Sequence, residues 1–418
     1  MLTNLKIILC FLWIVPMINS GGCRSKTSET GPVVVEETSV ADTSKVLPIR
    51  VGAAQMDRYL DKLKGKKVAL VVNQTSRVGS QHLVDTLLAS GIDIRRLFAP
   101  EHGFRGEADA GEQIKDGVDT QTGVPVISLY GNNKKPSAAH LKGLDYIVFD
   151  IQDVGARFYT YISTMHYVME ACAEEKVAFL VLDRPNPNGH YVDGPLLNLD
   201  YQSFVGMHPI PVVHGMTIAE YARMINGEAW LKEGQQCQLE WVLCENYDHQ
   251  RFYELPIKPS PNLPNSQSIY LYPSLCFFEG TVLSAGRGTN KQFQIYGHPN
   301  LETGDFQFTP QSMPGAKYPK HEGKTCRGVD LSQMPTADLQ AEAQLNLDYL
   351  LNAYQNFPDK AQFFLPNHFI DKLAGSDQLR KQIEAGQSAF QIRQSWAAGL
   401  QSFKLIRRKY LLYEDALN

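Results

Sequence analysis

The chain contains an uninterrupted apolar run, Val68-Ala69-Leu70-Val71-Val72, which is followed at once by the polar Asn73-Gln74-Thr75-Ser76. Such a run is typical of a strand that is buried on both faces of a parallel sheet. Similar runs recur along the chain, separated by helix-like stretches at 80–90 and about 163–175. They lie at 94–99, 124–130, 146–149 and 178–182. The pattern predicts an α/β fold with a Rossmann-like parallel sheet domain over residues 49–195.

The strand-helix rhythm is lost after residues 185–198, which are rich in Pro and Asn. An amphipathic helix is expected over 216–231, with Thr217 as its N-cap and Glu220 completing an approximate capping box. The later segments are a strand at 237–243, loops at 255–274 and 286–327, and helical stretches at about 336–354 and 376–400. We therefore expect residues 196–418 to form a smaller α+β subdomain that packs against the first.

The N-terminal residues have the pattern of a secretion signal. Lys6 precedes the apolar residues 7–15, which are too few to span a bilayer and fit the core of a signal peptide. Small residues then precede Cys23, as in the lipobox of a bacterial lipoprotein; a cleaved signal with an incidental cysteine is the alternative. We expect a signal peptide at 1–22, a lipid anchor on Cys23 and a flexible tether at 23–48. The protein would then be anchored in the cell envelope, facing the periplasm or the cell exterior.

The composition excludes several classes of protein. A chain of 418 residues with 43% hydrophobic residues is long enough for two or three domains with a sizeable core. Its 40 Lys and Arg and 44 Asp and Glu give a net charge of −4, so a nucleic-acid partner is not expected. The 7 cysteines include no CxxC pair, and we expect most of the five in the body of the chain to be small buried hydrophobes. No G-x-G-x-x-G motif follows a strand, and no cofactor is predicted.

Polar side chains follow four of the predicted strands, at the edge where open parallel sheets bind ligands. The acidic ones are Glu101, Asp150, Asp153 and Asp183. We expect them to meet at one edge if their strands are adjacent. Paired carboxylates are what cleavage of a glycosidic bond requires, one as an acid and the other as a base, nucleophile or charge stabiliser.

Other residues in these segments suit the same chemistry. His102, Arg157 and Arg184 are candidates to tune the carboxylates or to bind an anionic group. Tyr159 and Tyr161 offer apolar faces to a sugar ring. Residues of these types also have structural uses, since Asp and Asn cap helices and form turns, and Asp183-Arg184 is equally consistent with a structural ion pair.

The second half contributes further candidate motifs. They are His214-Gly215-Met216-Thr217, Ser260-Pro261-Asn262, Glu279-Gly280-Thr281 and Gly286-Arg287-Gly288-Thr289. Arg287 has the side chain to bind a carboxylate bidentately, although a glycine-rich loop with one arginine is also an ordinary tight turn.

Taken in order, the motifs of the chain resemble the exo-β-N-acetylmuramidase NamZ family. The resemblance rests on Asn73-Gln74-Thr75, Pro100-Glu101-His102-Gly103, residues 150–161, residues 183–187 and the motifs that begin at His214, Ser260 and Gly286, and it covers about 50–413. It implies a glycoside hydrolase that releases N-acetylmuramic acid (MurNAc) from the non-reducing end of peptidoglycan fragments. The substrates would be MurNAc-GlcNAc saccharides, bound in a cleft between the two subdomains.

The resemblance also implies roles for individual residues. Glu101 is the first candidate for the general acid, with Asp150 or Asp153 assisting, and Arg157 or Arg287 would hold the lactyl carboxylate of muramic acid. The candidates for substrate binding are Asn73, His102, Arg157, Tyr159, Tyr161, Asp183, Arg184, His214, Asn262, Glu279 and Arg287. The acetamido oxygen of the substrate is an alternative to an enzymic nucleophile.

Two other functions remain open at this point. One is a metal-dependent hydrolase or deacetylase of cell-wall glycans, with ligands drawn from His102, Asp150, Asp153 and His214. The other is a glycan-binding lipoprotein without catalytic activity.

Overall fold

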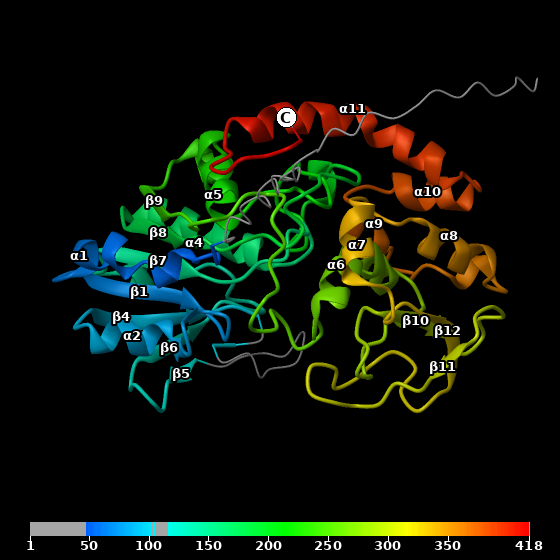
Figure 1. The fold of residues 1–418 in the computed structure, drawn as a ribbon, viewed down its shortest axis with the longest axis horizontal. Helices are drawn as coiled ribbons and strands as arrows, with labels where there is room; N and C mark the ends of the chain where they lie inside the picture. The colour runs from blue at the N-terminus through cyan, green and yellow to red at the C-terminus, as the bar shows by residue number, and fades with distance from the viewer. Residues whose placement is uncertain (1–46, 102, 105–115, 418) are drawn as a thin grey trace, which may run out of the picture. The chain divides into compact units, whose positions relative to one another are not determined.

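The computed structural model describes residues 47–101, 103–104 and 116–417 (Figure 1). The expected signal peptide, Cys23 and most of the tether lie outside the described residues, as does His102. Seven strands form one sheet in the order β5-β6-β4-β1-β7-β8-β9, and all neighbouring pairs are parallel except β5 with β6. This is a doubly wound order with β1 near the centre, so the predicted Rossmann-like sheet is confirmed. The strands are β1 (Lys67–Val72), β4 (Asp93–Ala99), β5 (Gly117–Val118), β6 (Pro125–Ser128), β7 (Tyr146–Asp150), β8 (Ala178–Leu182) and β9 (Leu239–Val242).

Alternate residues of β1 enter two separate apolar cores. Val68, Leu70 and Val72 pack in the core that includes α1 (Leu60–Leu63) and α2 (Leu83–Ala89). Ala69 and Val71 pack in the core that includes α4 (Tyr161–Glu175) and α5 (Ile218–Gly227). Both faces of the strand are therefore covered, which is why its sequence is apolar at every position from 68 to 72.

The place of β9 corrects one prediction. The sequence assigns the strand at 237–243 to the second subdomain, whereas β9 pairs in parallel with β8 and extends the large sheet. Helix α5, whose predicted capping box between Thr217 and Glu220 is confirmed, packs against both strands. The unit β8-α5-β9 is hard to recognise in the sequence because a long irregular segment separates β8 from α5.

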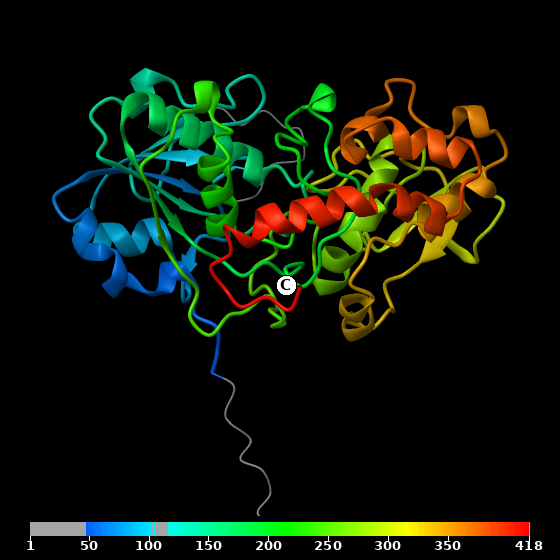
Figure 2. The same ribbon diagram turned by 90° about the horizontal axis from the view of Figure 1, so that it is seen from above.

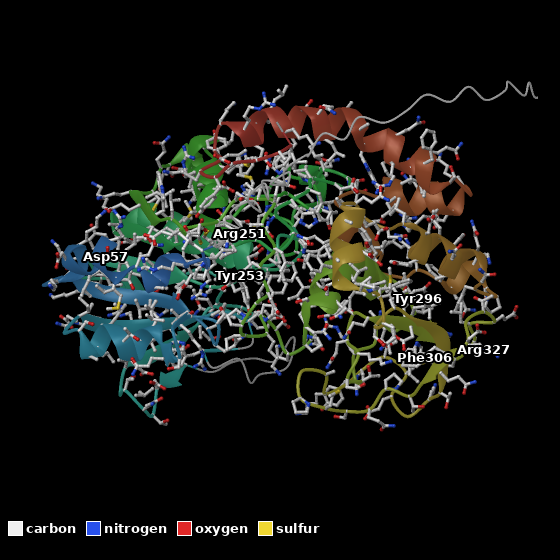
Figure 3. The ribbon with its side chains drawn as sticks, in the orientation of Figure 1. Asp57, Arg251, Tyr253, Tyr296, Phe306 and Arg327 are labelled. Carbon is white, nitrogen blue, oxygen red and sulfur yellow. The ribbon has the colours of Figure 1, made fainter. Side chains whose placement is uncertain are left out.

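The C-terminal part combines helices with a small antiparallel sheet of order β10-β12-β11. Figure 3 labels Tyr296, Phe306 and Arg327 on this sheet. The strands are β10 (Ile295–His298), β11 (Phe306–Phe308) and β12 (Cys326–Asp330), and the helices are α6 (Ser266–Leu275), α7 (Thr336–Glu342), α8 (Asp348–Gln355), α9 (Phe369–Ala374), α10 (Gln378–Glu384) and α11 (Ala389–Arg408). The second part is thus α+β, as predicted.

Two expectations about this part are wrong in detail. Each of the two predicted helical stretches is a pair of helices, because Ala343 and Gly386 adopt positive φ values of 45° and 72° between them. The segments 255–274 and 286–327 are not simply loops: α6 begins at Ser266 with a capping box from Asn265 and contains Pro273, and 286–327 includes β10, β11 and the start of β12. The prolines of the segment 255–274 disfavour a helix locally, so the sequence pattern does not predict one here.

Helix α11 lies along both parts of the described chain (Figures 1 and 2). Arg393 forms an ion pair with Asp193 at 2.6 Å, and Arg407 donates from Nε to the carbonyl of Gly215 at 3.0 Å. Among the described helices, none combines the length and the apolar composition that a membrane span requires. The five body cysteines are buried and free, as expected; they are Cys172, Cys237, Cys244, Cys276 and Cys326.

Candidate active site

A cavity of about 260 Å³ lies where the carboxyl edge of the large sheet meets the C-terminal part. Its walls combine aromatic rings with a few polar groups, which is the usual character of a ligand site. The lining residues are Glu101, Tyr130, Phe158, Tyr159, Thr160, Tyr161, Phe204, Val205, Ser260, Asn262, Leu263, Tyr272, Cys276, Glu279, Arg287, Phe293, Phe369 and Leu373. Six predicted site residues are therefore brought together here: Glu101, Tyr159, Tyr161, Asn262, Glu279 and Arg287.

Glu101 is the carboxylate that the large sheet contributes. It follows the carboxyl end of β4 and is half-buried. The hydroxyl of Thr160, the residue before α4, donates to Glu101 Oε2 at 2.8 Å. The end of β4 and the residue before α4 thus hold this carboxyl group at the pocket wall.

Tyr159 and Tyr161 form an aromatic wall. Their ring centroids lie 4.9 Å apart in an edge-to-face arrangement, and Tyr272 of α6 meets Tyr159 edge-on at 5.8 Å. Both hydroxyls donate to the carbonyl of Pro259, at 2.9 Å and 3.3 Å. Burial raises the pKa of both phenols well above the usual value, so they stay neutral donors.

Glu279 is the carboxylate that the C-terminal part contributes. It lies in the 3-10 helix η5 (Cys276–Gly280), and Arg287 Nε donates to its Oε1 at 3.1 Å. The Arg287 guanidinium also lies over the ring of Phe293, 5.1 Å from the centroid. Burial raises the pKa of Glu279, but the charges of Arg287 and Lys320 outweigh burial, and the net pKa is lower than usual.

Lys320 holds the segment that carries Glu279. Its Nζ donates to the carbonyls of Phe278 at 3.0 Å and Thr281 at 2.7 Å, and it also lies within hydrogen-bond distance of the carbonyls of Glu279 and Leu283. Sequence reasoning missed Lys320, and no local signal marks it, because its partners are backbone groups about forty residues away.

Asp150 and Arg184, by contrast, do not line the pocket. Arg184 donates from Nε to Asp150 Oδ1 at 2.6 Å and from Nη2 to Oδ2 at 2.9 Å, and both side chains are buried. The ion pair considered between Asp183 and Arg184 is therefore not formed, because Arg184 pairs with Asp150 and Asp183 accepts from Tyr413. Asn73 is also buried beneath this edge, where its Oδ1 accepts from the backbone and hydroxyl of Thr75.

Asp153 and Arg157 are likewise buried outside the pocket lining. Asp153 Oδ1 accepts from the backbone of Gly155 at 2.7 Å, and burial raises the pKa of this carboxyl to about 7. Arg157 donates to three carbonyls, those of Pro195, Ile210 and Leu373. It therefore ties α9 to the segment 195–210 and is not placed to bind a substrate anion.

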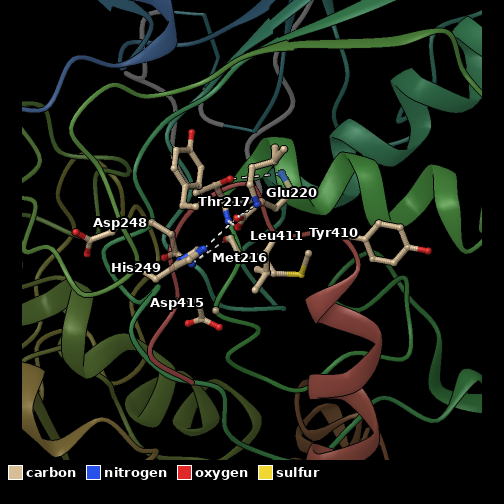
Figure 4. A network of polar contacts seen from close by, with 12 residues as sticks. Met216, Thr217, Glu220, Asp248, His249, Tyr410, Leu411 and Asp415 are labelled. Carbon is tan, nitrogen blue, oxygen red and sulfur yellow. Dashed lines mark hydrogen bonds and ion pairs between the residues drawn. The ribbon is translucent and has the colours of Figure 1, made fainter. Parts of the chain in front are cut away.

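Asp183 belongs to a buried network that fastens the C-terminal segment, and His214 is buried too, with its Nδ1 accepting from the backbone of Met216. Tyr413 donates its hydroxyl to Asp183 at 2.6 Å. Figure 4 shows the adjoining contacts, in which Glu220 accepts from the backbone of Thr217 at 2.8 Å and meets His249 Nε2 at 3.0 Å. Burial, with a smaller contribution from Arg407, lowers the pKa of His214 to about 3, so its ring is neutral.

The residues considered as metal ligands are not assembled into a cluster. Within the described chain, no group of three or more His, Cys, Asp or Glu side chains is placed to hold a metal ion. Asp150 is taken up by Arg184, and His102 lies outside the described residues.

Glycoside hydrolases use two carboxylates, and this pocket has two of them beside aromatic rings. The chain is a glycoside hydrolase, as its similarity to known enzymes also shows. Family models for the N-terminal and C-terminal domains of the exo-β-N-acetylmuramidase NamZ match residues 68–267 and 270–413. The chain is a member of the NamZ family, and the resemblance predicted from its motifs is confirmed.

Individual relatives agree with this assignment. The peptidoglycan β-N-acetylmuramidase NamZ of Bacillus subtilis (strain 168) is 40% identical over 379 residues, which are 85% of this chain and 89% of that protein. A crystal structure of a DUF1343 family protein from Bacteroides fragilis NCTC 9343 matches with a TM-score of 0.82 and 48% identity, covering 88% of this chain and 100% of that one. A second DUF1343 protein of the same organism matches with a TM-score of 0.76 and 28% identity, covering 88% and 99%.

Proposed function

We propose that this enzyme releases MurNAc from the non-reducing end of peptidoglycan fragments, with Glu101 as the general acid. The main support for the assignment is that Glu101, Glu279 and Arg287 line one pocket with aromatic walls. The Bacillus subtilis relative, of which the chain covers 89%, is named for the same activity.

The acid must deliver a proton to the glycosidic oxygen as its bond to the anomeric carbon breaks. Glu101 suits this role because its hydrogen-bond partner is the neutral hydroxyl of Thr160. Glu279, by contrast, is paired with a cation and kept ionised, so it cannot donate a proton. Asp150 and Asp153, the assisting groups suggested by the sequence, do not line the pocket.

Arg287 is the candidate to recognise the lactyl carboxylate of muramic acid. Its Nε is engaged by Glu279, while its two Nη groups have no hydrogen-bond partner in the described part of the chain. Two N–H groups on one guanidinium edge match the geometry of a carboxylate. Tyr159 and Tyr161 supply the wall against which the sugar ring would lie.

The test is release of MurNAc from the disaccharide MurNAc-GlcNAc and from a chromogenic aryl β-N-acetylmuramide. Wild type should act on both, and Glu101→Gln should lose disaccharide turnover by about 10²–10⁴-fold. The matched control is Glu302→Gln, the same change at an exposed carboxylate on the loop before β11. Inactivity of wild type on both substrates would refute the activity; a Glu101→Gln enzyme as fast as the control would refute the role of Glu101.

We propose further that Cys23 carries a lipid anchor that holds the enzyme in the cell envelope. The support is the sequence alone, in which an apolar core and small residues precede this cysteine. Labelling with a fatty-acid analogue should mark the full-length chain and should not mark Cys23→Ser. Equal labelling of the two chains would refute the anchor.

A further inference from the structure

Two carboxylates reach the pocket from parts of the chain that are far apart in sequence. Glu101 comes from the end of β4, and Glu279 comes from η5 in the C-terminal part. Among the described residues that line the pocket, these are the two acidic side chains. We propose that Glu279 is the second catalytic carboxylate and acts as a fixed negative charge beside the anomeric carbon. The proposal rests on the proposed function, because it assigns a role within the same reaction.

The backbone under Glu279 is held rigidly. The ammonium of Lys320 bonds the carbonyls of Phe278 and Thr281, on either side of Glu279. Gly280 meets α9 so closely that an added Cβ would lie 2.5 Å from the Cα of Ile370. A carboxylate on such a support keeps its position during the reaction, which is the requirement for electrostatic stabilisation of a transition state.

The charges around Glu279 favour its anionic form. Arg287 bonds one carboxylate oxygen at 3.1 Å, and the charge of Lys320 also acts on this carboxylate. The other oxygen, Oε2, has no hydrogen-bond partner in the described part of the chain, although the side chain is 24% exposed at the pocket. One oxygen is therefore anchored while the other is available to the substrate.

This environment selects among the possible roles. A carboxylate whose pKa is lowered by two cations is a weak base, so it is poorly suited to take a proton from water at neutral pH. It is well suited to stabilise the positive charge that develops on the sugar ring, or to polarise the N–H of the 2-acetamido group as that group assists. Asp150, the alternative from the sequence, is buried outside the pocket lining, and both of its carboxylate oxygens are bonded to Arg184.

The experiment compares Glu279→Gln with Glu101→Gln on two substrates. Glu279→Gln keeps the size of the side chain and an oxygen for Arg287 but removes the charge. Its kcat should fall about 10²–10³-fold on both substrates, with KM changed by less than about threefold. Glu101→Gln should lose far less on a 4-nitrophenyl muramide than on the disaccharide, because nitrophenolate leaves without protonation.

Three outcomes would overturn the assignment. They are unchanged kcat in Glu279→Gln, a loss confined to the disaccharide, and a loss that lies in KM alone. Glu279→Asp, which keeps the charge, should retain at least about tenfold more activity than Glu279→Gln; equal or lower activity would also contradict the proposal.

Controls separate folding and binding from catalysis. The variants should bind MurNAc in calorimetry with affinities within about threefold of wild type, and Glu302→Gln should match wild type in all assays. Loss of MurNAc binding in both Glu279 variants would mean a binding role and would overturn the catalytic one. If wild type itself turns over neither substrate, the proposed function fails; if wild type is active and Glu279→Gln is equally active, only the role of Glu279 fails.

Discussion

Arg184 donates two hydrogen bonds to Asp150 beneath the carboxyl edge of the large sheet, from Nε to Oδ1 at 2.6 Å and from Nη2 to Oδ2 at 2.9 Å. Both partners are buried, and the pair joins the end of β7 to the residues that follow β8. The carboxylate that the sequence offers as a catalytic partner is therefore part of the scaffold under the pocket.

Removing one partner of this ion pair should destabilise the fold. Asp150→Asn leaves the Arg184 charge buried without a counter-charge, and we expect a loss of about 3–5 kcal/mol in the free energy of unfolding. Urea unfolding followed by circular dichroism measures it. The double variant Asp150→Asn/Arg184→Met should recover part of this loss; strictly additive losses would show that the two side chains are not coupled.

Arg287 should control the choice between muramic acid and N-acetylglucosamine. Arg287→Gln removes the charge proposed to bind the lactyl group, so the preference for an aryl β-N-acetylmuramide over the matching glucosaminide should fall about 10–100-fold in kcat/KM. Arg327→Gln, the same change at an exposed position of β12, serves as the control. An unchanged preference in Arg287→Gln would contradict carboxylate recognition by this residue.

Lys320 should lower the pH at which activity is lost on the acid side of the pH-rate profile, because its charge lowers the pKa of Glu279. The pKa of Glu279 is held low, so this carboxyl stays ionised as the pH falls. Lys320→Met removes one of the cations, the pKa rises, and activity should be lost at a higher pH on the acid side. The measurement is kcat/KM of the folded variant between about pH 3 and pH 7.

Lys317→Met is the matched control, because this exposed lysine lies on the same loop. Its acid limb should coincide with that of wild type. An acid limb that does not move in Lys320→Met would show that Lys320 supports the backbone without acting on the charge of Glu279.

Asp153 should make the fold less stable as the pH rises. Its pKa is raised to about 7 in the folded chain, against an ordinary value of 3.8. Between these values the unfolded chain releases the proton and the folded chain retains it, so the free energy of unfolding falls with rising pH until about pH 7. Above that range the loss is complete.

Asp153→Asn removes this titration. The difference in unfolding free energy between wild type and variant should therefore shift in favour of the variant from pH 4.5 to pH 8, measured by urea unfolding at both values. Asp183 has the same sign of shift and is present in both chains, so it cancels in this comparison. A difference that does not depend on pH would contradict the burial of a protonated Asp153.

Much of the large sheet could be predicted because its signals are local. Five consecutive apolar residues at 68–72 indicate a strand that is covered on both faces. The capping box of Thr217 and Glu220, a signal only four residues long, marks the start of α5. The sequence assigns β9 to the wrong part because its place depends on a distant partner strand, and it misses α6 altogether. The sequence predicts the strand β9 but does not show that it pairs with β8. Helix α6 contains a proline, and the low helix propensity of proline argues against a helix there.

The α/β class, the succession of the first strands along the chain and the carboxylate of Glu101 directly after one of them all follow from local sequence. Which polar residues share a pocket depends on tertiary packing. Asp150 ends β7 and Glu101 follows β4, yet Asp150 pairs with Arg184 while Glu101 lines a pocket with Glu279 and Arg287 of the C-terminal part. The physical reason is one of distance along the chain. A pattern of apolar residues is complete within a few positions, whereas the partner of a buried charge comes from a distant segment that packs beside it only in the folded chain.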